Sequence, residues 1–134
     1  MKTIIVGAGR LARSLARRLA EAGHQVTIIV SAPPAQKLPG QVIQGVGFDL
    51  ETLEQAGVRE AQLLIAVADS ENTNLVSAQV AKLHFQVPRV VARVEDPKKA
   101  DFYRQQGFEV FCPIRLGLAR VEELLANGMD REEK

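Results

Sequence analysis

The residues of this chain with the clearest chemical meaning lie at its start, where an apolar run, Thr3 to Val6, leads into a glycine-rich turn. Gly7 permits a tight turn from a strand into a helix, Gly9 leaves room for a pyrophosphate beside the backbone, and Ala12 lets the helix pack closely on a sheet. The N–H groups that open such a helix face the phosphate, and the helix dipole favours negative charge there. The spacing therefore predicts a phosphate-binding turn.

The sequence after this turn supplies the elements that such a turn requires. Leu11, Leu15 and Leu19 recur at helical spacing, Gly23 follows as a stop, and Gln25 to Val30 has the composition of a second strand. These segments are evidence independent of the glycine spacing. Together with it they favour a strand–helix–strand unit of the dinucleotide-binding type.

The end of the second expected strand lacks the usual ribose anchor. NAD sites of this kind normally place Asp or Glu there to accept the ribose hydroxyls, whereas this chain has Val30 followed by Ser31. NADP sites usually supply an Arg, and the cation between Ser31 and Gly40 is Lys37. A charged hydrogen bond contributes about 1.5–3 kcal/mol, or roughly ten- to a hundredfold in affinity. The sequence therefore predicts an intact phosphate side and weakened NAD binding.

Length and composition exclude several classes of protein. The 134 residues fit one domain, and a net charge of +1 offers no basic surface for nucleic acid. The single cysteine, Cys112, cannot form an internal disulfide, and no metal-ligand cluster is evident. No apolar run approaches the roughly 18–20 residues of a membrane span. We expect a cytoplasmic protein without a metal site that is not itself embedded in a membrane.

Strands and helices alternate along the chain. Beyond the first unit and a proline-rich turn, strands are expected at 41–44, 63–67, 89–94 and 109–111, and helices at 50–56, 72–83, 97–106 and 114–126. This alternation predicts a single α/β domain, a doubly wound, Rossmann-like parallel sheet of about six strands in the order 3-2-1-4-5-6. Residues 1–113 would form the nucleotide-binding domain, 114–127 a C-terminal helix, and 128–134 a charged tail that frays.

With these elements in order, the sequence resembles the N-terminal nucleotide-binding domain of regulators of K⁺ conductance, the RCK or KTN domains of Trk- and Ktr-type potassium uptake systems. The resemblance extends over about residues 2–126. It rests on separated segments, namely Ile4–Arg10, Asp49–Gly57, Ala61–Val67, Asp69–Asn74, Val91–Val94 and Arg104–Pro113.

The resemblance implies a set of nucleotide-binding residues at the ends of several strands. They are Gly7, Ala8, Gly9, Arg10, Leu11, Val30, Ser31, Ala68, Asp69, Asn74 and Arg93. Two positions depart from the family pattern, because Val30 replaces the ribose acid and Val46 replaces the Asp of a Gly-Asp-Ala segment. The departures suit AMP, ADP or ATP better than NAD, although NAD(H) and a domain without a ligand stay as alternatives.

Several of these residues also have a structural interpretation. Asp69 precedes a helix and is expected to cap it. Arg93 is either a ligand contact or a paired structural arginine. Arg10 is expected at the phosphate, whereas Arg13, Arg17 and their neighbour Arg18 are expected on the solvated face of the first helix.

The last helix has apolar positions that suggest an interface. Leu118, Val121 and Leu125 recur at three- and four-residue spacing and form one stripe, and Leu116, Leu124 and Ile114 broaden the apolar surface of the helix beyond this stripe. In the family that the chain resembles, the equivalent helix crosses to a second copy. A homodimer or a higher ring is therefore expected, with an ordinary covering helix as the alternative.

The resemblance implies a regulatory module without a catalytic residue, which acts on a membrane potassium transporter or channel subunit at the inner face of the membrane. The alternatives are a small NAD(P)-dependent oxidoreductase and a scaffold domain that binds no nucleotide. The enzyme is disfavoured because the chain has one tyrosine and no Tyr-xxx-Lys pair.

Overall fold

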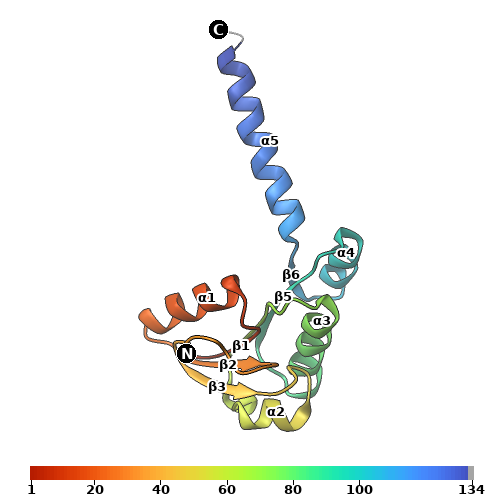
Figure 1. Ribbon diagram of the computed structural model, residues 1–134. Helices are drawn as coiled ribbons and strands as arrows, with labels where there is room; N and C mark the ends of the chain where they lie inside the picture. The colour runs from red at the N-terminus through yellow and green to blue at the C-terminus, as the bar shows by residue number, and fades with distance from the viewer. Residues whose placement is uncertain (133–134) are drawn as a thin grey trace.

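Six strands form one parallel sheet in the computed structural model, which describes residues 1–132. The strands are β1 (Lys2–Val6), β2 (Gln25–Val30), β3 (Gln41–Gln44), β4 (Leu63–Ala66), β5 (Arg89–Arg93) and β6 (Glu109–Phe111). Their order across the sheet is β3-β2-β1-β4-β5-β6, which confirms the predicted doubly wound topology (Figure 1). The order changes direction beside β1, because β2 pairs with one of its edges and β4 with the other.

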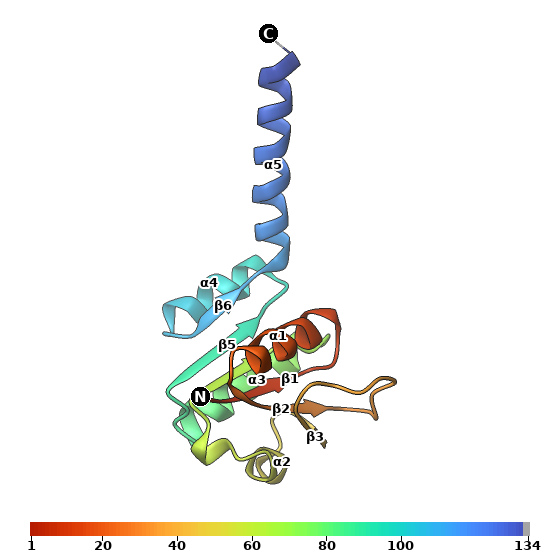
Figure 2. The same ribbon diagram turned by 90° about the vertical axis from the view of Figure 1, so that its left-hand side faces the viewer.

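The central strands are apolar on both sides because helices cover both faces of the sheet. The helical segments are α1 (Arg10–Glu21), α2 (Leu50–Gln55), η1 (Val58–Glu60), α3 (Glu71–Gln79), η2 (Val80–His84), α4 (Pro97–Gln105) and α5 (Pro113–Glu132). One core joins α1 to Ile5 and Ile28, and the other joins α2 and α3 to Ile4 and Leu64. Figure 2 shows α1 and α2 on opposite sides of the strands. Burial on both faces is typical of parallel sheets.

Two helices differ from their predicted bounds. The helix expected at 72–83 is α3 followed by the π-helical segment η2, in which the N–H of Phe85 donates to the carbonyl of Val80 at 3.2 Å. The last helix continues to Glu132, through most of the tail expected to fray, and residues 133 and 134 lie outside the described part. Neither Gly117 nor Gly128 ends α5.

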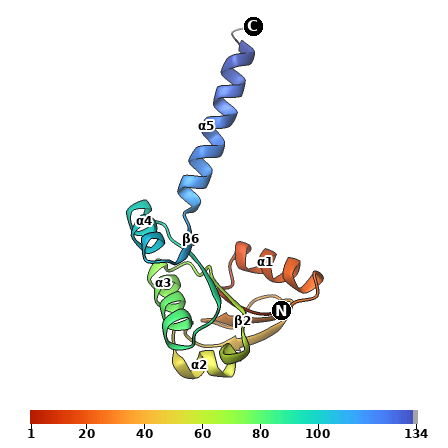
Figure 3. The same cartoon turned by 180° about the vertical axis from the view of Figure 1, so that it is seen from behind.

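Helix α5 extends away from the sheet instead of covering it. In Figures 1 and 3 it leaves the domain after β6 and runs outward with no other element along its length. Its first turn is attached to α4 by a two-pronged ion pair, in which Arg115 donates to Asp101 at 2.6 and 2.9 Å. The alternative of an ordinary covering helix on the same sheet is therefore wrong.

Candidate functional site

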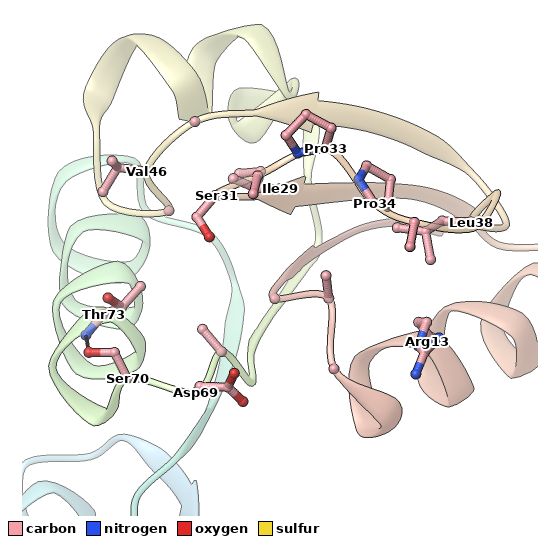
Figure 4. A pocket seen from close by; sticks show the side chains of 18 of the residues that line it. Arg13, Ile29, Ser31, Pro33, Pro34, Leu38, Val46, Asp69, Ser70 and Thr73 are labelled. Atoms are coloured by element: carbon pink, nitrogen blue, oxygen red, sulfur yellow. Dashed lines mark hydrogen bonds between the residues drawn. The ribbon is translucent and has the colours of Figure 1, made fainter.

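A crevice of about 650 Å³ opens at the carboxyl ends of β1, β2, β3 and β4 (Figure 4). Ligands of open α/β sheets bind at this edge, where the strand order reverses. The crevice is lined by Gly7, Ala8, Gly9, Arg13, Ile29, Ser31, Ala32, Pro33, Pro34, Ala35, Gln36, Leu38, Gly45, Val46, Gly47, Ala68, Asp69, Ser70 and Thr73.

The two glycines of the first turn have different structural tasks. Gly7 has φ +126°, and a Cβ atom there would lie 2.9 Å from the backbone N of Ala68 and the carbonyl oxygen of Val67. The turn after β1 therefore packs directly on the segment after β4. At Gly9 a Cβ would meet nothing closer than Asp69 Oδ1 at 3.9 Å, so the space in front of this residue is open.

The N-terminus of α1 faces this open space without a side-chain cap. Gly9 is the N-cap residue, no side chain accepts a hydrogen bond from the first turn, and that turn contains no acidic residue. The first N–H groups of a helix have no partner within the helix. Together with the helix dipole, they are suited to bind a phosphate.

The structure brings six of the eleven expected residues together around the crevice, namely Gly7, Ala8, Gly9, Ser31, Ala68 and Asp69. The other five, Arg10, Leu11, Val30, Asn74 and Arg93, do not line it.

Val30 belongs to the core and not to the mouth of the crevice. Its side chain is 1% exposed and belongs to the apolar cluster that contains Ile5 and Leu38. Successive strand residues point to opposite faces, so Ile29 and Ser31 line the crevice while Val30 points to the α1 side. The expectation that position 30 faces the ligand is corrected accordingly.

Asn74 and Arg93 hold the site's framework and do not line it. The Asn74 amide is 1% exposed, accepts a hydrogen bond from the Ala68 N–H at 2.7 Å, and donates to the carbonyls of Ala68 (2.8 Å) and Arg93 (3.2 Å). It therefore ties the segments after β4 and β5 to α3. The Arg93 guanidinium pairs with Glu95 at 2.6 Å, which matches the structural interpretation of this arginine.

Asp69 lines the crevice and does not cap α3. The cap is Ser70, whose hydroxyl oxygen accepts a hydrogen bond from the Thr73 N–H at 3.3 Å. Figure 4 shows Asp69 at the floor of the crevice, across from Arg13. Among residues 1–128, whose side chains are described, the Asp69 carboxylate has no partner in an ion pair or hydrogen bond.

Sequence reasoning missed one wall of the crevice. Pro33, Pro34 and Leu38 form an apolar surface opposite Asp69, and Arg13 lies beside Leu38 (Figure 4). Arg13 follows Arg10 by three residues, which places both on one side of α1. The spacing of the two arginines can be read from the sequence. The packing of the proline-rich segment 31–40 against α1 cannot.

A smaller hollow adjoins the crevice between α1 and the segment 36–39. It is lined by Arg10, Arg13, Ser14, Arg17, Gln36, Lys37, Leu38 and Pro39. Arg13, Gln36 and Leu38 line both cavities, so the two are adjacent. Arg10, expected at the phosphate, lies in this hollow.

Among the described residues, no three His, Cys, Asp or Glu side chains gather as metal ligands. In the same part of the chain, no helix combines the length and the apolar character needed to cross a membrane.

Comparison with known proteins matches residues 3–113 to the TrkA-N domain family. A curated relative, the Trk system potassium uptake protein TrkA of Streptomyces coelicolor, is 35% identical over 120 residues. The match covers 86% of this chain and 54% of the relative, so the chain spans about half the length of that protein.

Two solved structures share the fold. The AMP-bound form of the Kef CTD from Shewanella denitrificans has a TM-score of 0.74 and 26% identity, and the match covers 92% of this chain and 82% of that one. GsuK bound to ADP has a TM-score of 0.82 and 23% identity, over 95% of this chain and 34% of that one.

Proposed function

The chain belongs to the TrkA-N domain family, and from this membership we propose that it is a regulatory module of a potassium transport system that binds an adenine nucleotide in its crevice. The module is non-enzymatic, and its output is a change in the arrangement of subunits. A ligand shifts such an equilibrium only by the difference between its affinities for the two arrangements.

The observation that carries the proposal is the uncapped N-terminus of α1 facing open space. The amides at the start of α1 bind the 5′-phosphates, and Gly9 lets the phosphates approach the backbone. Arg13 on the crevice wall supplies the neighbouring positive charge. The Asp69 carboxylate borders this position, because its Oδ1 lies 3.9 Å from where a Cβ of Gly9 would be, so the phosphate binds on the α1 side of it.

The lining favours AMP, ADP or ATP over NAD. Val30 is buried and Val46 is apolar, so neither position supplies the carboxylates that hold ribose and adenine in the family pattern. The phosphate side keeps its amides and its cation, so binding energy comes mainly from the 5′-phosphates. A relative of similar fold is known in an AMP-bound form, and NAD(H) stays the alternative ligand.

The partners follow from α5 and from the family. The exposed apolar stripe of α5 docks on a second copy of the chain, and the resulting homodimer, or a ring built from it, contacts a membrane potassium transporter or channel subunit at its cytoplasmic side. Residues 1–113 thus form the ligand-binding part and 114–127 the part that connects copies.

Calorimetric titration of the full chain with AMP, ADP, ATP and NADH tests the ligand. We expect the mono-, di- and triphosphates to bind and NADH to bind more weakly. Binding of NADH well below 1 µM, with AMP and ATP inert, would contradict the assignment.

Gly9→Val tests the position of the phosphate. Gly9 has φ −74° and ψ −175°, extended backbone that any residue adopts, so the fold survives the change. The new side chain fills the open space, and nucleotide binding is abolished while the melting temperature of the unliganded protein stays close to that of the wild type. Undiminished binding by this variant would place the nucleotide elsewhere.

A further inference from the structure

We propose that the hollow between α1 and the segment 36–39 is a second anion subsite, which takes a phosphate on the 2′-oxygen of the bound adenosine. The inference rests on the proposed function, because the adenosine has to occupy the crevice first. It assigns a more specific ligand class, adenine nucleotides that carry a 2′-phosphate in addition to the 5′-phosphate.

Four cations converge on this hollow. Arg10, Arg13 and Arg17 follow one another at three- and four-residue spacing and so share one side of α1, and Lys37 lines the facing wall. Ser14 and Gln36 add neutral hydrogen-bond donors. No acidic side chain lines the hollow.

These cations are not engaged by the protein itself. None of the four makes an ion pair with a carboxylate of residues 1–128, whose side chains the structure describes, whereas Arg59, Arg89, Arg93, Arg104, Arg115, Arg120 and Lys99 all do. The first turn of α1 contains no acid that could neutralise them. Four like charges around one hollow repel one another unless an anion lies between them.

The hollow adjoins the crevice on the side of the segment that follows β2. This segment begins at Ser31, which lines the crevice, and its residues 36–39 line the hollow. Because the ribose hydroxyls lie at the end of this strand in dinucleotide-binding folds, we place the ribose edge of the nucleotide on this side of the crevice. The glycine turn lines the crevice but not the hollow. The 5′-phosphate therefore binds in the crevice and the second anion in the hollow. Arg13 and Gln36 line both cavities.

The buried Val30 fits the same ligand. An acid at the end of β2 accepts hydrogen bonds from free ribose hydroxyls and repels a phosphate on the 2′-oxygen. In this chain Val30 points into the core and Ser31 lines the crevice, so no carboxylate at the end of β2 faces the ligand. The guanidinium groups that line the adjoining hollow can bind phosphate oxygens through paired N–H donors.

Calorimetry with adenosine 2′,5′-bisphosphate, adenosine 3′,5′-bisphosphate and AMP tests the proposal on the full chain. We expect the 2′,5′-bisphosphate to bind at least about tenfold more tightly than AMP and more tightly than its 3′,5′ isomer. The advantage should shrink as salt is raised, because Arg10, Arg17 and Lys37 are exposed and Arg13 is only partly buried. NADP should exceed NAD by a similar factor.

Arg17→Ala and Lys37→Ala each remove a cation that lines the hollow but not the crevice. Both should lower the affinity for the 2′,5′-bisphosphate about tenfold and leave the affinity for AMP nearly unchanged. Arg18→Ala is the matched control, since Arg18 is an exposed arginine of the same helix that lines neither cavity.

Three outcomes would overturn the inference. Equal affinities for AMP and the 2′,5′-bisphosphate, or for the two isomers, would remove the 2′-subsite while leaving the proposed function intact. An equal loss in Arg18→Ala would show a diffuse effect of charge. If no adenine nucleotide binds at all, the proposed function fails together with the subsite.

Discussion

Val30 and Ser31 are neighbours in sequence with opposite environments, and substitutions at the two positions should behave differently. Val30→Asp places a carboxylate in the core beside α1, where no cation is buried with it. We expect it to lower the free energy of unfolding by about 3 kcal/mol or more. Ser31→Asp lies in the exposed crevice wall and should leave that free energy within about 0.5 kcal/mol of the wild type. Urea unfolding measures both, and a stable Val30→Asp protein would contradict the burial.

The same pair gives a binding prediction. In Ser31→Asp a carboxylate lies at the ribose edge of the crevice, where it can accept hydrogen bonds from ribose hydroxyls and repels a 2′-phosphate. We expect the affinity for AMP to hold or rise and the affinity for adenosine 2′,5′-bisphosphate to fall about tenfold. Competition between the two nucleotides, followed by calorimetry, measures this reversal. Parallel changes in both affinities would contradict it.

At this scale the sequence predicted those crevice-lining residues whose position follows from backbone geometry. Gly7, Ala8 and Gly9 are defined by their spacing after a strand, and Asp69 by its place after the next central strand. Arg13 was missed because its position on the crevice wall depends on the segment 31–40, which follows β2 and packs back against α1. Such a contact between distant segments leaves no local pattern in the chain.

Among the elements, α3 packs on the sheet through apolar side chains and is also linked to the ends of β4 and β5 by one buried amide. Asn74→Ala removes three hydrogen bonds and leaves the Ala68 N–H and the carbonyls of Ala68 and Arg93 without their partner. Unsatisfied buried groups cost about 1–3 kcal/mol each, so we expect a loss of about 3 kcal/mol in the free energy of unfolding. Asn72→Ala is the control, because Asn72 is an exposed residue of the same helix. Equal stability of the two variants in urea would contradict this role.

The junction between α4 and α5 should respond to acid. The hydrogen bond from Arg115 holds the pKa of the Asp101 carboxyl below its ordinary value of 3.8. A lowered pKa in the folded state means that the pair contributes stability above pH 3.8, and the contribution is lost as pH falls through the lower folded value. Carbon-13 NMR titration of Asp101 should show this lowered midpoint, and Arg115→Ala should return it toward 3.8. An unchanged midpoint in the variant would contradict the cause.

The strands were predicted more accurately than the helix ends. Apolar runs such as Leu63 to Ala66 are buried on both faces, and this pattern is local to each strand. The end of α5 was not predictable in the same way, because Gly128 and the charged residues after it indicate fraying while the helix continues to Glu132. An ion pair between Arg120 and Glu123 at 3.2 Å supports the helix in its middle.

In the molecule as a whole, α5 carries an apolar surface that its own copy of the chain does not cover. Ile114, Leu118, Val121 and Leu125 lie on one side of this helix, and Leu118 and Leu125 are 57% and 60% exposed. The helix stands clear of the sheet in all three views, so its own domain cannot bury that side (Figures 1–3). Large exposed apolar surfaces mark interaction sites.

Docking of α5 on a second copy should therefore make the protein a homodimer. Full burial contributes about 1.5–3 kcal/mol for each leucine, and the four apolar residues on each copy together offset the cost of association. Light scattering should give about twice the chain mass of 14.6 kDa.

Leu118→Glu combined with Leu125→Glu should give a folded monomer with an unchanged nucleotide affinity. Leu116→Glu, at a 62% exposed position on the opposite side of α5, should stay dimeric. A wild-type protein that is monomeric at high concentration, or dissociation caused equally by Leu116→Glu, would contradict the stripe as the interface.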